Sequence, residues 1–380
     1  MGSVEEVDKH VLRKYEIQQK LGKGAYAVVF KAIDKKTKNV VALKKIFDAF
    51  QNSTDAQRTF REIMFLQEMA GHDHIVTLVN CLKADNDRDI YLVFEIMETD
   101  LHAAIRANIL QDIHKQYLTW QTLKALKYMH SAELLHRDMK PSNLLLNSEC
   151  LMKVADFGLA RSLAEIQAGT GEGATVLTDY VATRWYRAPE ILLGSTAYHL
   201  GVDMWSVGCI MGEMLCGQPV FPGSSTIDQL QKVMELTGFP SPAEIAAMHS
   251  PFAATMLESL PPMAPLAEDV WQTRFPTASA DAIHLMRRLL SFDPAQRPTA
   301  AEALQHPYVA QFHDAANEGD APRKVRCVID DNVKKSTAVY RERLYHEITK
   351  MKRRSKERPS EAKEERKAGK GGRENQAPRQ

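Results

Sequence analysis

The sequence predicts an α+β fold with two lobes, a small β-rich N-lobe and a larger α-helical C-lobe. Strand-like runs dominate up to about Phe94, and helical patterns dominate after Asp100. With 380 residues, the chain is too long for one average domain and suits two lobes followed by a tail. The join between the lobes is predicted near Met97.

The N-lobe consists mostly of short β-rich runs. One predicted helix, from Asp55 to Met69, interrupts them with an apolar stripe. A charged, turn-like stretch at 34–39 separates the first two runs. The predicted strands are 28–30, 40–43, 75–79 and 90–94.

The C-lobe shows long amphipathic patterns, and the C-terminal part changes in composition. A further helical stripe runs from Lys334 to Met351, whereas the chain beyond Lys352 is rich in Lys, Arg, Glu and Gly. That last segment has too little apolar surface to offset its ordering entropy, so we expect disorder there. The C-lobe helices are predicted at 117–130, 203–215, 226–236 and 280–290.

Charge and cysteine content exclude several classes of protein. The 49 Lys and Arg nearly cancel the 48 Asp and Glu, which gives no reason to expect a nucleic acid or a membrane surface as partner. The basic excess lies after residue 320. Five cysteines without a C-x-x-C pair argue against a disulfide framework and a zinc site. With no signal peptide and no apolar run near ~18 residues, we expect a cytoplasmic and also nuclear protein.

A glycine-rich hairpin, Gly22-Lys23-Gly24-Ala25-Tyr26-Ala27-Val28-Val29, is the first candidate for binding chemistry. Phosphate oxygens need close backbone N–H groups, which a Cβ would obstruct. Alone, the hairpin is more typical of a tight surface turn, and Ala27 stands where a third glycine is usual. Its interpretation therefore depends on the residues that follow.

Lys44 follows the hairpin on a predicted strand, in Val41-Ala42-Leu43-Lys44. From there its ammonium can reach the α- and β-phosphates of ATP, and Glu62 on the next helix is the carboxylate expected to hold it. The competing interpretation of Glu62 is a solvated helical charge, because Arg58, Arg61 and Glu68 lie on the same helix.

The strongest signals are three strings in a fixed order. His136-Arg137-Asp138-Met139-Lys140-Pro141-Ser142-Asn143 precedes an apolar strand, Asp156-Phe157-Gly158 follows, and Ala188-Pro189-Glu190 comes later. Each could occur by chance, but together they form the protein-kinase signature set. Phosphoryl transfer needs positioning and charge neutralisation more than covalent chemistry. Asp138 is expected to accept the substrate hydroxyl proton, Lys140 to neutralise the transferring group, and Asn143 and Asp156 to hold Mg²⁺.

Two further predictions concern support of this site. Asp203 opens a helix where an acceptor side chain can cap backbone N–H groups, and we expect it to support the catalytic loop. Glu190 and Arg297 are candidates for a buried ion pair.

Residues 15–312 resemble the branch of protein kinases that contains the mitogen-activated protein (MAP) kinases. Within it the chain is similar to the atypical extracellular-signal-regulated kinase seven/eight type, also called MAP kinase fifteen. The resemblance implies an N-lobe at about 15–97, a C-lobe at about 98–312, an N-terminal extension at 1–14, and a C-terminal extension at 313–351 whose helix packs on the kinase. It rests on Gln57–Ile63, Met97–Leu101, Lys140–Asn143, Val181–Arg187, Gly201–Trp205 and Tyr340–Tyr345, and on Phe94 as gatekeeper.

The resemblance also implies ligands. It implies ATP with Mg²⁺, a monomer, and protein substrates with proline after the target Ser or Thr. Nucleotide contacts are assigned to Leu21, Gly22, Lys23, Gly24, Ala25, Tyr26, Ala27, Val29, Ala42, Lys44, Phe94, Glu95, Met97, Asp100, Leu145 and Asp156.

In MAP kinases the Thr and Tyr of a T-x-Y segment are phosphorylated, here Thr178 and Tyr180 around Asp179. Each phosphate adds about −2 charge and favours arginine partners. The phosphothreonine contacts correspond to Arg61, Arg137 and Arg161, and the phosphotyrosine contacts to Arg184 and Arg187.

Departures from the family favour activation by autophosphorylation. In the acidic docking patch only Asp314 matches, because Asn317 stands where Asp is typical and Glu318 lies beside it; weak binding of basic docking peptides is expected. The Gly/Ala/Thr-rich loop from Ser162 to Thr175 is long enough to let the phosphosites reach their own active site. The alternatives are a conventional MAP kinase that needs an upstream kinase, and an idle scaffold.

The basic tail at 352–380 leaves two interpretations open. It could bind an acidic partner, microtubules or a nuclear import factor, or it could be a solvated charged segment. A location at the cilium or basal body is implied by the resemblance only.

Overall fold

The computed structural model describes residues 7–24, 26–168, 183–195, 199–261, 263, 266–325, 329 and 333–350. Ala25, Thr178, Asp179, Tyr180 and the basic tail lie outside these residues. The chain forms two compact units. The first contains the described residues up to Phe60, Val79–Phe94 and those from Lys335 onward, and the second contains Arg61–Leu78 and Glu95–Lys334.

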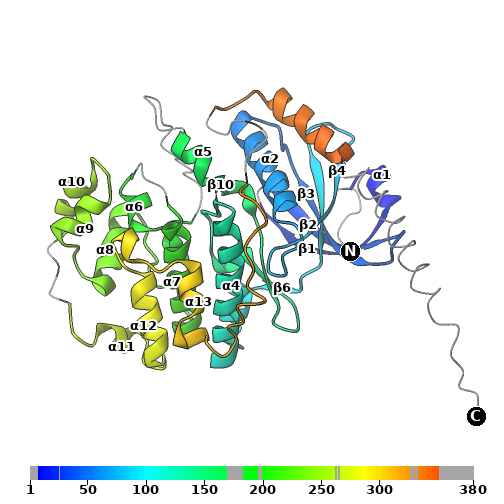
Figure 1. Cartoon of the computed structure of the whole chain (residues 1–380). Helices are drawn as coiled ribbons and strands as arrows, with labels where there is room; N and C mark the ends of the chain where they lie inside the picture. The colour runs from blue at the N-terminus through cyan, green and yellow to red at the C-terminus, as the bar shows by residue number, and fades with distance from the viewer. Residues whose placement is uncertain are drawn as a thin grey trace, which may run out of the picture. The chain divides into compact units, whose positions relative to one another are not determined.

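The first unit is built around a five-stranded sheet in the order β1-β2-β3-β5-β4 (Figure 1). β1 pairs antiparallel with β2, and β2 pairs antiparallel with β3. The strands are β1 Tyr15–Lys23, β2 Ala27–Asp34, β3 Val40–Ile46, β4 Leu78–Lys83 and β5 Ile90–Glu95. Together with the helical second unit, this sheet confirms the predicted α+β class.

One face of this sheet forms the core of the first unit. Side chains alternate between faces along a strand, and Val28, Phe30, Val41 and Leu43 are buried together. The helix α1, Lys9–Leu12, joins this core through Val11, which is fully buried. Residues 7–14 are therefore part of the packed unit.

A C-terminal helix at 337–350 also belongs to the first unit, and it lies beside α2, Ser53–Glu68, in Figure 1. Its buried stripe is Tyr340, Leu344 and Ile348. The ring of Tyr340 lies 5.8 Å from that of Phe60 on α2. The helix predicted at Lys334–Met351 therefore forms at 337–350, and it packs on Phe60 within the same unit.

The second unit is mainly helical. Its central helix is α7, Gly201–Cys216, which packs against α4, Asp112–Ser131, and α12, Ala280–Leu289. A Cβ at Gly208 would lie 2.8 Å from Leu290, so glycine lets α7 approach the end of α12. The remaining helices of four or more residues are α3 Leu101–Arg106, α5 Leu163–Ala168, α6 Pro189–Leu192, α8 Thr226–Thr237, α9 Pro242–Ala247, α10 Ala253–Glu258, α11 Val270–Arg274 and α13 Ala300–Leu304.

Two small sheets accompany these helices. One has the order β6-β8-β9, and the other pairs β7 with β10. Their strands are β6 Thr99–Asp100, β7 Leu134–Leu135, β8 Leu144–Leu146, β9 Met152–Val154 and β10 Arg161–Ser162. Among the described residues, no helix is long and apolar enough to cross a membrane.

The predicted strand at 75–79 is wrong. Ile75 and Val76 are buried, but the backbone here bonds to β9: Val76 N–H donates to Val154 C=O at 3.0 Å, and Val154 N–H donates to His74 C=O at 2.9 Å. The strand of the first sheet lies later, at Leu78–Lys83. The helix prediction for 117–130 was too short at its polar start, since α4 begins at Asp112.

A pair of neutral histidines makes the second unit sensitive to acid. Burial lowers the pKa of both His72 and His74 to about 4. His74 Nδ1–H donates to Met152 C=O at 3.1 Å, and His72 stacks on Tyr128. In the unfolded chain these imidazoles bind a proton below about pH 6.5, whereas in the folded chain they do so only below about pH 4. Between these two pH values the unfolded state binds more protons, so lowering the pH favours unfolding.

We therefore expect the free energy of unfolding to fall as the pH drops from 7 to 5. His74 alone contributes up to roughly 3 kcal/mol across its window, about 1.4 kcal/mol per pKa unit. Urea unfolding at several pH values measures this, and His74→Gln should flatten the slope. His346→Gln, on an exposed side chain, serves as the control. An unchanged slope in His74→Gln would contradict the prediction.

Candidate active site

The catalytic loop lies between β7 and β8, and its backbone is held by Asp203 of α7. The Asp203 carboxylate accepts from His136 N–H and from Arg137 N–H, both at 2.9 Å, and lies 3.0 Å from His130 Nε2. Arg137 has φ +67°, a left-handed conformation that needs such support. The predicted support of the loop by Asp203 is confirmed.

The predicted capping of its own helix by Asp203 is wrong. α7 begins at Gly201, and its N-cap residue, Leu200, makes no side-chain cap. Burial alone would raise the pKa of Asp203, but hydrogen bonds and charge from His130 and His136 hold that pKa below its ordinary value. The carboxylate is therefore ionised and serves the catalytic loop.

Asp138, Lys140 and Asn143 come together within this loop. Lys140 Nζ lies 2.7 Å from Asp138 Oδ2. Asn143 Nδ2 donates to Asp138 C=O at 2.8 Å and to Asp138 Oδ2 at 3.1 Å. The short 3₁₀ turn Pro141–Asn143 sets this geometry. The result is a carboxylate that can accept a proton, beside an ammonium that can neutralise a phosphoryl group.

The segment Asp156-Phe157-Gly158 is tied to the same loop. Ala155 N–H donates to Asn143 C=O at 2.9 Å. His136 Nδ1 accepts from Asp138 N–H at 3.3 Å, so Nε2 carries the proton and donates to Ala155 C=O at 3.0 Å. Phe157 is fully buried and meets His136 edge-on. The position of Asp156 is therefore fixed relative to the catalytic loop.

The donor atoms here suit Mg²⁺. Asp156 is exposed, with φ +64°, and carries a carboxylate. Asn143 commits Nδ2 to Asp138, which leaves its amide oxygen Oδ1 as a ligand atom. Carboxylate and amide oxygens are ligands that Mg²⁺ prefers, so the two residues fit the ion assigned to them.

Most of the nucleotide contacts predicted in the N-lobe lie in the first unit. Gly24 N–H donates to Ala27 C=O at 2.8 Å and closes the glycine-rich hairpin. Val29 pairs with Lys44 across β2 and β3. By strand alternation Val29, Ala42 and Lys44 share the face opposite the buried core residues. Lys44 lies in the first unit and the buried Glu62 in the second, so their ion pair stays a prediction.

The nucleotide contacts predicted from Glu95 onward belong to the second unit. Glu95 Oε1 accepts from Thr77 N–H at 2.7 Å and lies 3.0 Å from Lys153 Nζ. Asp100 Oδ1 caps α3 by accepting from Ala103 N–H at 2.9 Å. Sequence reasoning missed Lys153, whose one signal is a lysine three residues before Asp156 on a buried strand.

All five arginines assigned to phosphate lie in the second unit. Arg61 and Arg161 are buried, and Arg137 Nη1 donates to Leu159 C=O at 3.2 Å. Arg184 Nη1 donates to Ser224 C=O at 2.9 Å. Because Thr178 and Tyr180 lie outside the described residues, the phosphate contacts, including that of Arg187, stay predictions.

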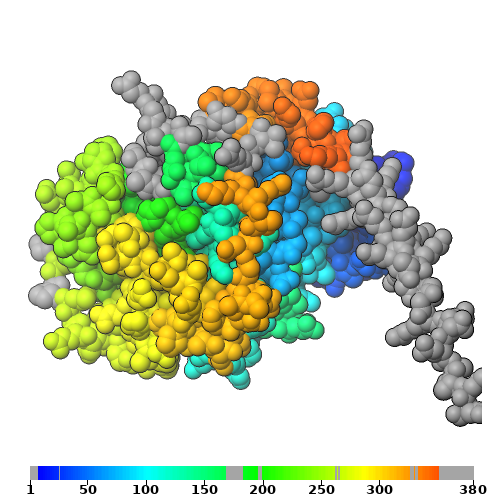
Figure 2. All heavy atoms as spheres, in the orientation of Figure 1, coloured from blue at the N-terminus to red at the C-terminus, as the bar shows by residue number. Residues whose placement is uncertain are grey.

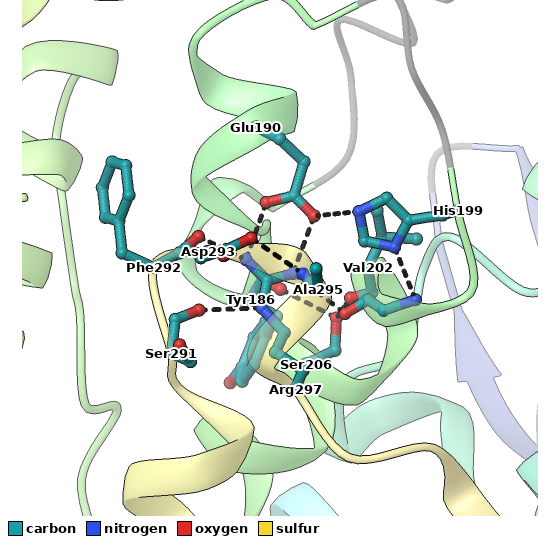
Figure 3. A network of polar contacts seen from close by, with 11 residues as sticks. Tyr186, Glu190, His199, Val202, Ser206, Ser291, Phe292, Asp293, Ala295 and Arg297 are labelled. Carbon is teal, nitrogen blue, oxygen red and sulfur yellow. Dashed lines mark hydrogen bonds and ion pairs between the residues drawn. The ribbon is translucent and has the colours of Figure 1, made fainter. Parts of the chain in front are cut away.

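The predicted ion pair between Glu190 and Arg297 is confirmed, and Figure 3 shows it at the centre of a polar network. Arg297 Nη1 and Nη2 donate to the two Glu190 oxygens at 2.7 and 2.8 Å. Its remaining donors bond to the carbonyls of Ser291, Gly201 and Phe292. All five guanidinium N–H groups therefore have acceptors, and both side chains are buried.

Glu318 is buried, and its carboxylate bonds to other residues of the chain. It is 1% exposed, and its carboxylate receives Trp120 Nε1–H at 2.7 Å, His313 Nδ1 at 2.9 Å and Asp314 N–H at 3.1 Å. The chain then runs along α4 to its C-terminal end, where Val325 N–H donates to Ala132 C=O. Figure 2 shows atoms of this part of the chain, in orange, at the surface. Glu318 is therefore not available to a docking peptide, whereas Asp314 is exposed.

The comparisons with known proteins agree with this site. A family model described as protein kinase domain matches residues 15–309. Extracellular signal-regulated kinase 2 from Dictyostelium discoideum is 63% identical over 94% of this chain and 95% of its own length. Mitogen-activated protein kinase 15 from Xenopus laevis is 52% identical over 91% of this chain and 59% of its own length. Extracellular signal-regulated kinase 7 from Drosophila melanogaster is 43% identical over 91% of this chain and 38% of its own length.

The chain therefore belongs to the protein kinases, as the fold and the catalytic loop indicate. Within them it is a MAP kinase of the type that includes extracellular signal-regulated kinase 7 and MAP kinase 15. It is an ATP-dependent Ser/Thr protein kinase that uses Mg²⁺, which excludes the idle scaffold. It spans about three fifths of the Xenopus relative and two fifths of the Drosophila relative.

Removing one partner of the buried ion pair should destabilise the second unit strongly. Arg297→Met leaves the Glu190 carboxylate buried without its counter-charge, which is expected to cost about 3–5 kcal/mol of unfolding free energy. Urea denaturation measures this, with Arg288→Met, on an exposed side chain, as control. A loss no larger than that of the control would overturn the prediction.

Proposed function

We propose that this kinase transfers the γ-phosphate of ATP to Ser or Thr residues followed by Pro. The arrangement of Asp138, Lys140 and Asn143 carries the proposal. Asp138 orients the substrate hydroxyl and accepts its proton, and Lys140, 2.7 Å away, neutralises the transferring phosphoryl group. Two hydrogen bonds from Asn143 Nδ2, one to the Asp138 carboxylate and one to its backbone carbonyl, keep the carboxylate oriented between turnovers.

Further residues are assigned to the nucleotide and its metal. The Asn143 Oδ1 atom and the Asp156 carboxylate would hold Mg²⁺, which would supply charge neutralisation for the phosphates when bound. Lys44 binds the α- and β-phosphates, and Glu62 holds Lys44. The glycine-rich hairpin cradles the phosphates. The rest of the nucleotide is contacted by Phe94, Glu95, Met97, Asp100 and Leu145. The shared face of Val29, Ala42 and Lys44 supports this arrangement.

Activation is proposed to follow phosphorylation of Thr178 and Tyr180 by the kinase itself. Arg61, Arg137 and Arg161 receive the phosphothreonine, and Arg184 and Arg187 the phosphotyrosine. The burial of Glu318 supports self-activation, because it removes one carboxylate from the surface that would dock an upstream kinase. Only weak docking near Asp314 is then expected.

The proposed setting is the cytoplasm and nucleus, with a monomeric kinase whose basic tail contacts an acidic partner. The basic excess beyond residue 320, in a chain of near-neutral overall charge, supports the tail as the part that contacts an acidic partner. The relatives' longer chains leave room for further segments in those proteins.

Expression alone in bacteria tests self-activation. We expect mass spectrometry to find phosphate on Thr178 and Tyr180 in the wild type and none in Asp138→Ala, because that change removes the proton acceptor. Absence of phosphate from the wild type would favour the alternative, a conventional MAP kinase that needs an upstream kinase.

A pair of peptides that differ only in Pro or Ala after the target Ser tests substrate choice. We expect kcat/KM to be about tenfold or more higher for the Pro peptide. The matched peptide with Pro before the Ser controls for a general effect of proline. Equal values for the Pro and Ala peptides would refute the proposed Ser/Thr-Pro specificity.

A further inference from the structure

A short segment, Arg184–Tyr186, is cross-linked to the start of α8. Trp185 Nε1–H donates to Gly223 C=O at 3.0 Å, and Arg184 Nη1 donates to Ser224 C=O at 2.9 Å. In return, Gln229 Nε2 donates to Trp185 C=O at 3.4 Å. The turn before α8 and the segment therefore hold each other by three hydrogen bonds.

Gln229 is the centre of this cross-link. Its side chain has no exposed area, and its amide oxygen accepts from Gly223 N–H at 3.0 Å while its amide nitrogen reaches Trp185. A Cβ at Gly223 would lie 2.4 Å from Gln229 Oε1 and 2.5 Å from Gln229 Cα, so only glycine fits against this amide. Gln229 thus joins the backbone at Gly223 to the backbone at Trp185, two positions far apart in the sequence.

Stability of α8 alone does not account for a buried amide at this position. The helix is capped by Ser225, whose Oγ accepts from Asp228 N–H at 3.1 Å. The other buried residues of α8 are mostly apolar, Leu230, Val233, Met234 and Leu236. Burying an amide is unfavourable unless its hydrogen bonds are made. The bonds that Gln229 makes reach outside α8, to Gly223 and Trp185.

The other end of the segment is anchored to α7. Ser206 Oγ donates to Tyr186 C=O at 2.8 Å, and Tyr186 Oη donates to Glu213 Oε2 at 2.6 Å. Figure 3 shows Tyr186 and Ser206 beside the Glu190–Arg297 pair. The segment is therefore held on both sides, by α7 at Tyr186 and by Gln229 at Trp185.

We propose that Gln229 is a positioning residue for substrate: by fixing Trp185, it sets the geometry in which Arg184–Arg187 receives the peptide after the target Ser or Thr. This rests on the proposed function, in which Arg184 and Arg187 of the same segment receive the phosphotyrosine and substrates carry Pro after the target Ser or Thr. Gln229 itself touches neither nucleotide nor peptide. Its loss affects peptide binding and leaves ATP binding unchanged.

Gln229→Met, which keeps the side-chain length and removes both amide bonds, is the test. The full chain is compared with wild type and with Gln231→Met, whose glutamine lies on the same helix and bonds only to Glu235 among the described residues. Preparations are matched in Thr178 and Tyr180 phosphate by mass spectrometry. The measurements are kcat and KM for the Pro and Ala peptides, and KM for ATP.

We expect Gln229→Met to raise the peptide KM by about fivefold or more, the factor that a lost hydrogen bond produces, and to reduce the Pro-to-Ala ratio of kcat/KM. The KM for ATP and the whole profile of Gln231→Met should stay within about twofold of wild type. An unchanged peptide KM, or an equal rise in the KM for ATP, overturns the inference.

Two further outcomes are decisive. If Gln229→Met does not fold, Gln229→Glu, which keeps an acceptor for Gly223 N–H and removes the donor to Trp185 C=O, must raise the peptide KM and leave the KM for ATP unchanged, or the inference fails. If the wild type itself does not prefer Pro, the proposed substrate specificity fails. The peptide KM of Gln229→Met relative to its KM for ATP still decides the role of Gln229.

Discussion

The buried carboxylate of Asp203 is the interaction on which the catalytic site depends. It receives two consecutive backbone N–H groups, of His136 and Arg137, in a loop that adopts a left-handed conformation at Arg137. An ionised acceptor is needed here because charge-assisted bonds are stronger than neutral ones and compensate the strained backbone. Within this loop, a hydrogen bond from Asn143 Nδ2 holds Asp138. A second hydrogen bond, from Ala155 N–H to Asn143 C=O, positions the neighbouring Asp156. The acidic groups of the site are therefore placed by one residue that has no chemical role.

The Glu190–Arg297 pair applies the same principle at the first residue of α7. A buried ion pair is stable only where every donor has an acceptor. Here three backbone carbonyls accept the guanidinium N–H groups of Arg297 that Glu190 does not. One of those carbonyls belongs to Gly201, the first residue of α7. The helix that carries Asp203 is thus fixed at its start by Arg297, and the two buried charge networks share one element.

Sequence reasoning predicted the residues whose chemistry demands a residue type. A proton acceptor, a metal ligand and a buried counter-ion must be Asp, Asn, Glu or Arg, so Asp138, Asn143, Glu190 and Arg297 stand out in their strings. The strand predicted at 75–79 failed because apolar runs indicate burial and not the pairing partner; Val76 bonds to β9. β1 was missed because eight of its nine residues are partly or fully exposed, so it lacks a buried stripe.

Residues that act on the backbone leave a weaker mark on the sequence. Asp203, Gln229 and Glu318 each receive main-chain N–H groups or reach main-chain carbonyls, and every residue except proline offers those groups. The residue that supplies the backbone group can therefore carry almost any side chain. No fixed spacing in the sequence connects it to the residue that bonds to it. Glu318 illustrates the consequence: as a charge beside Asp314 it suggested a docking surface, yet its contacts with Trp120, His313 and Asp314 make it the internal anchor of its own loop. Position in the fold, rather than residue type, separates a carboxylate that binds a partner from one that orders the chain.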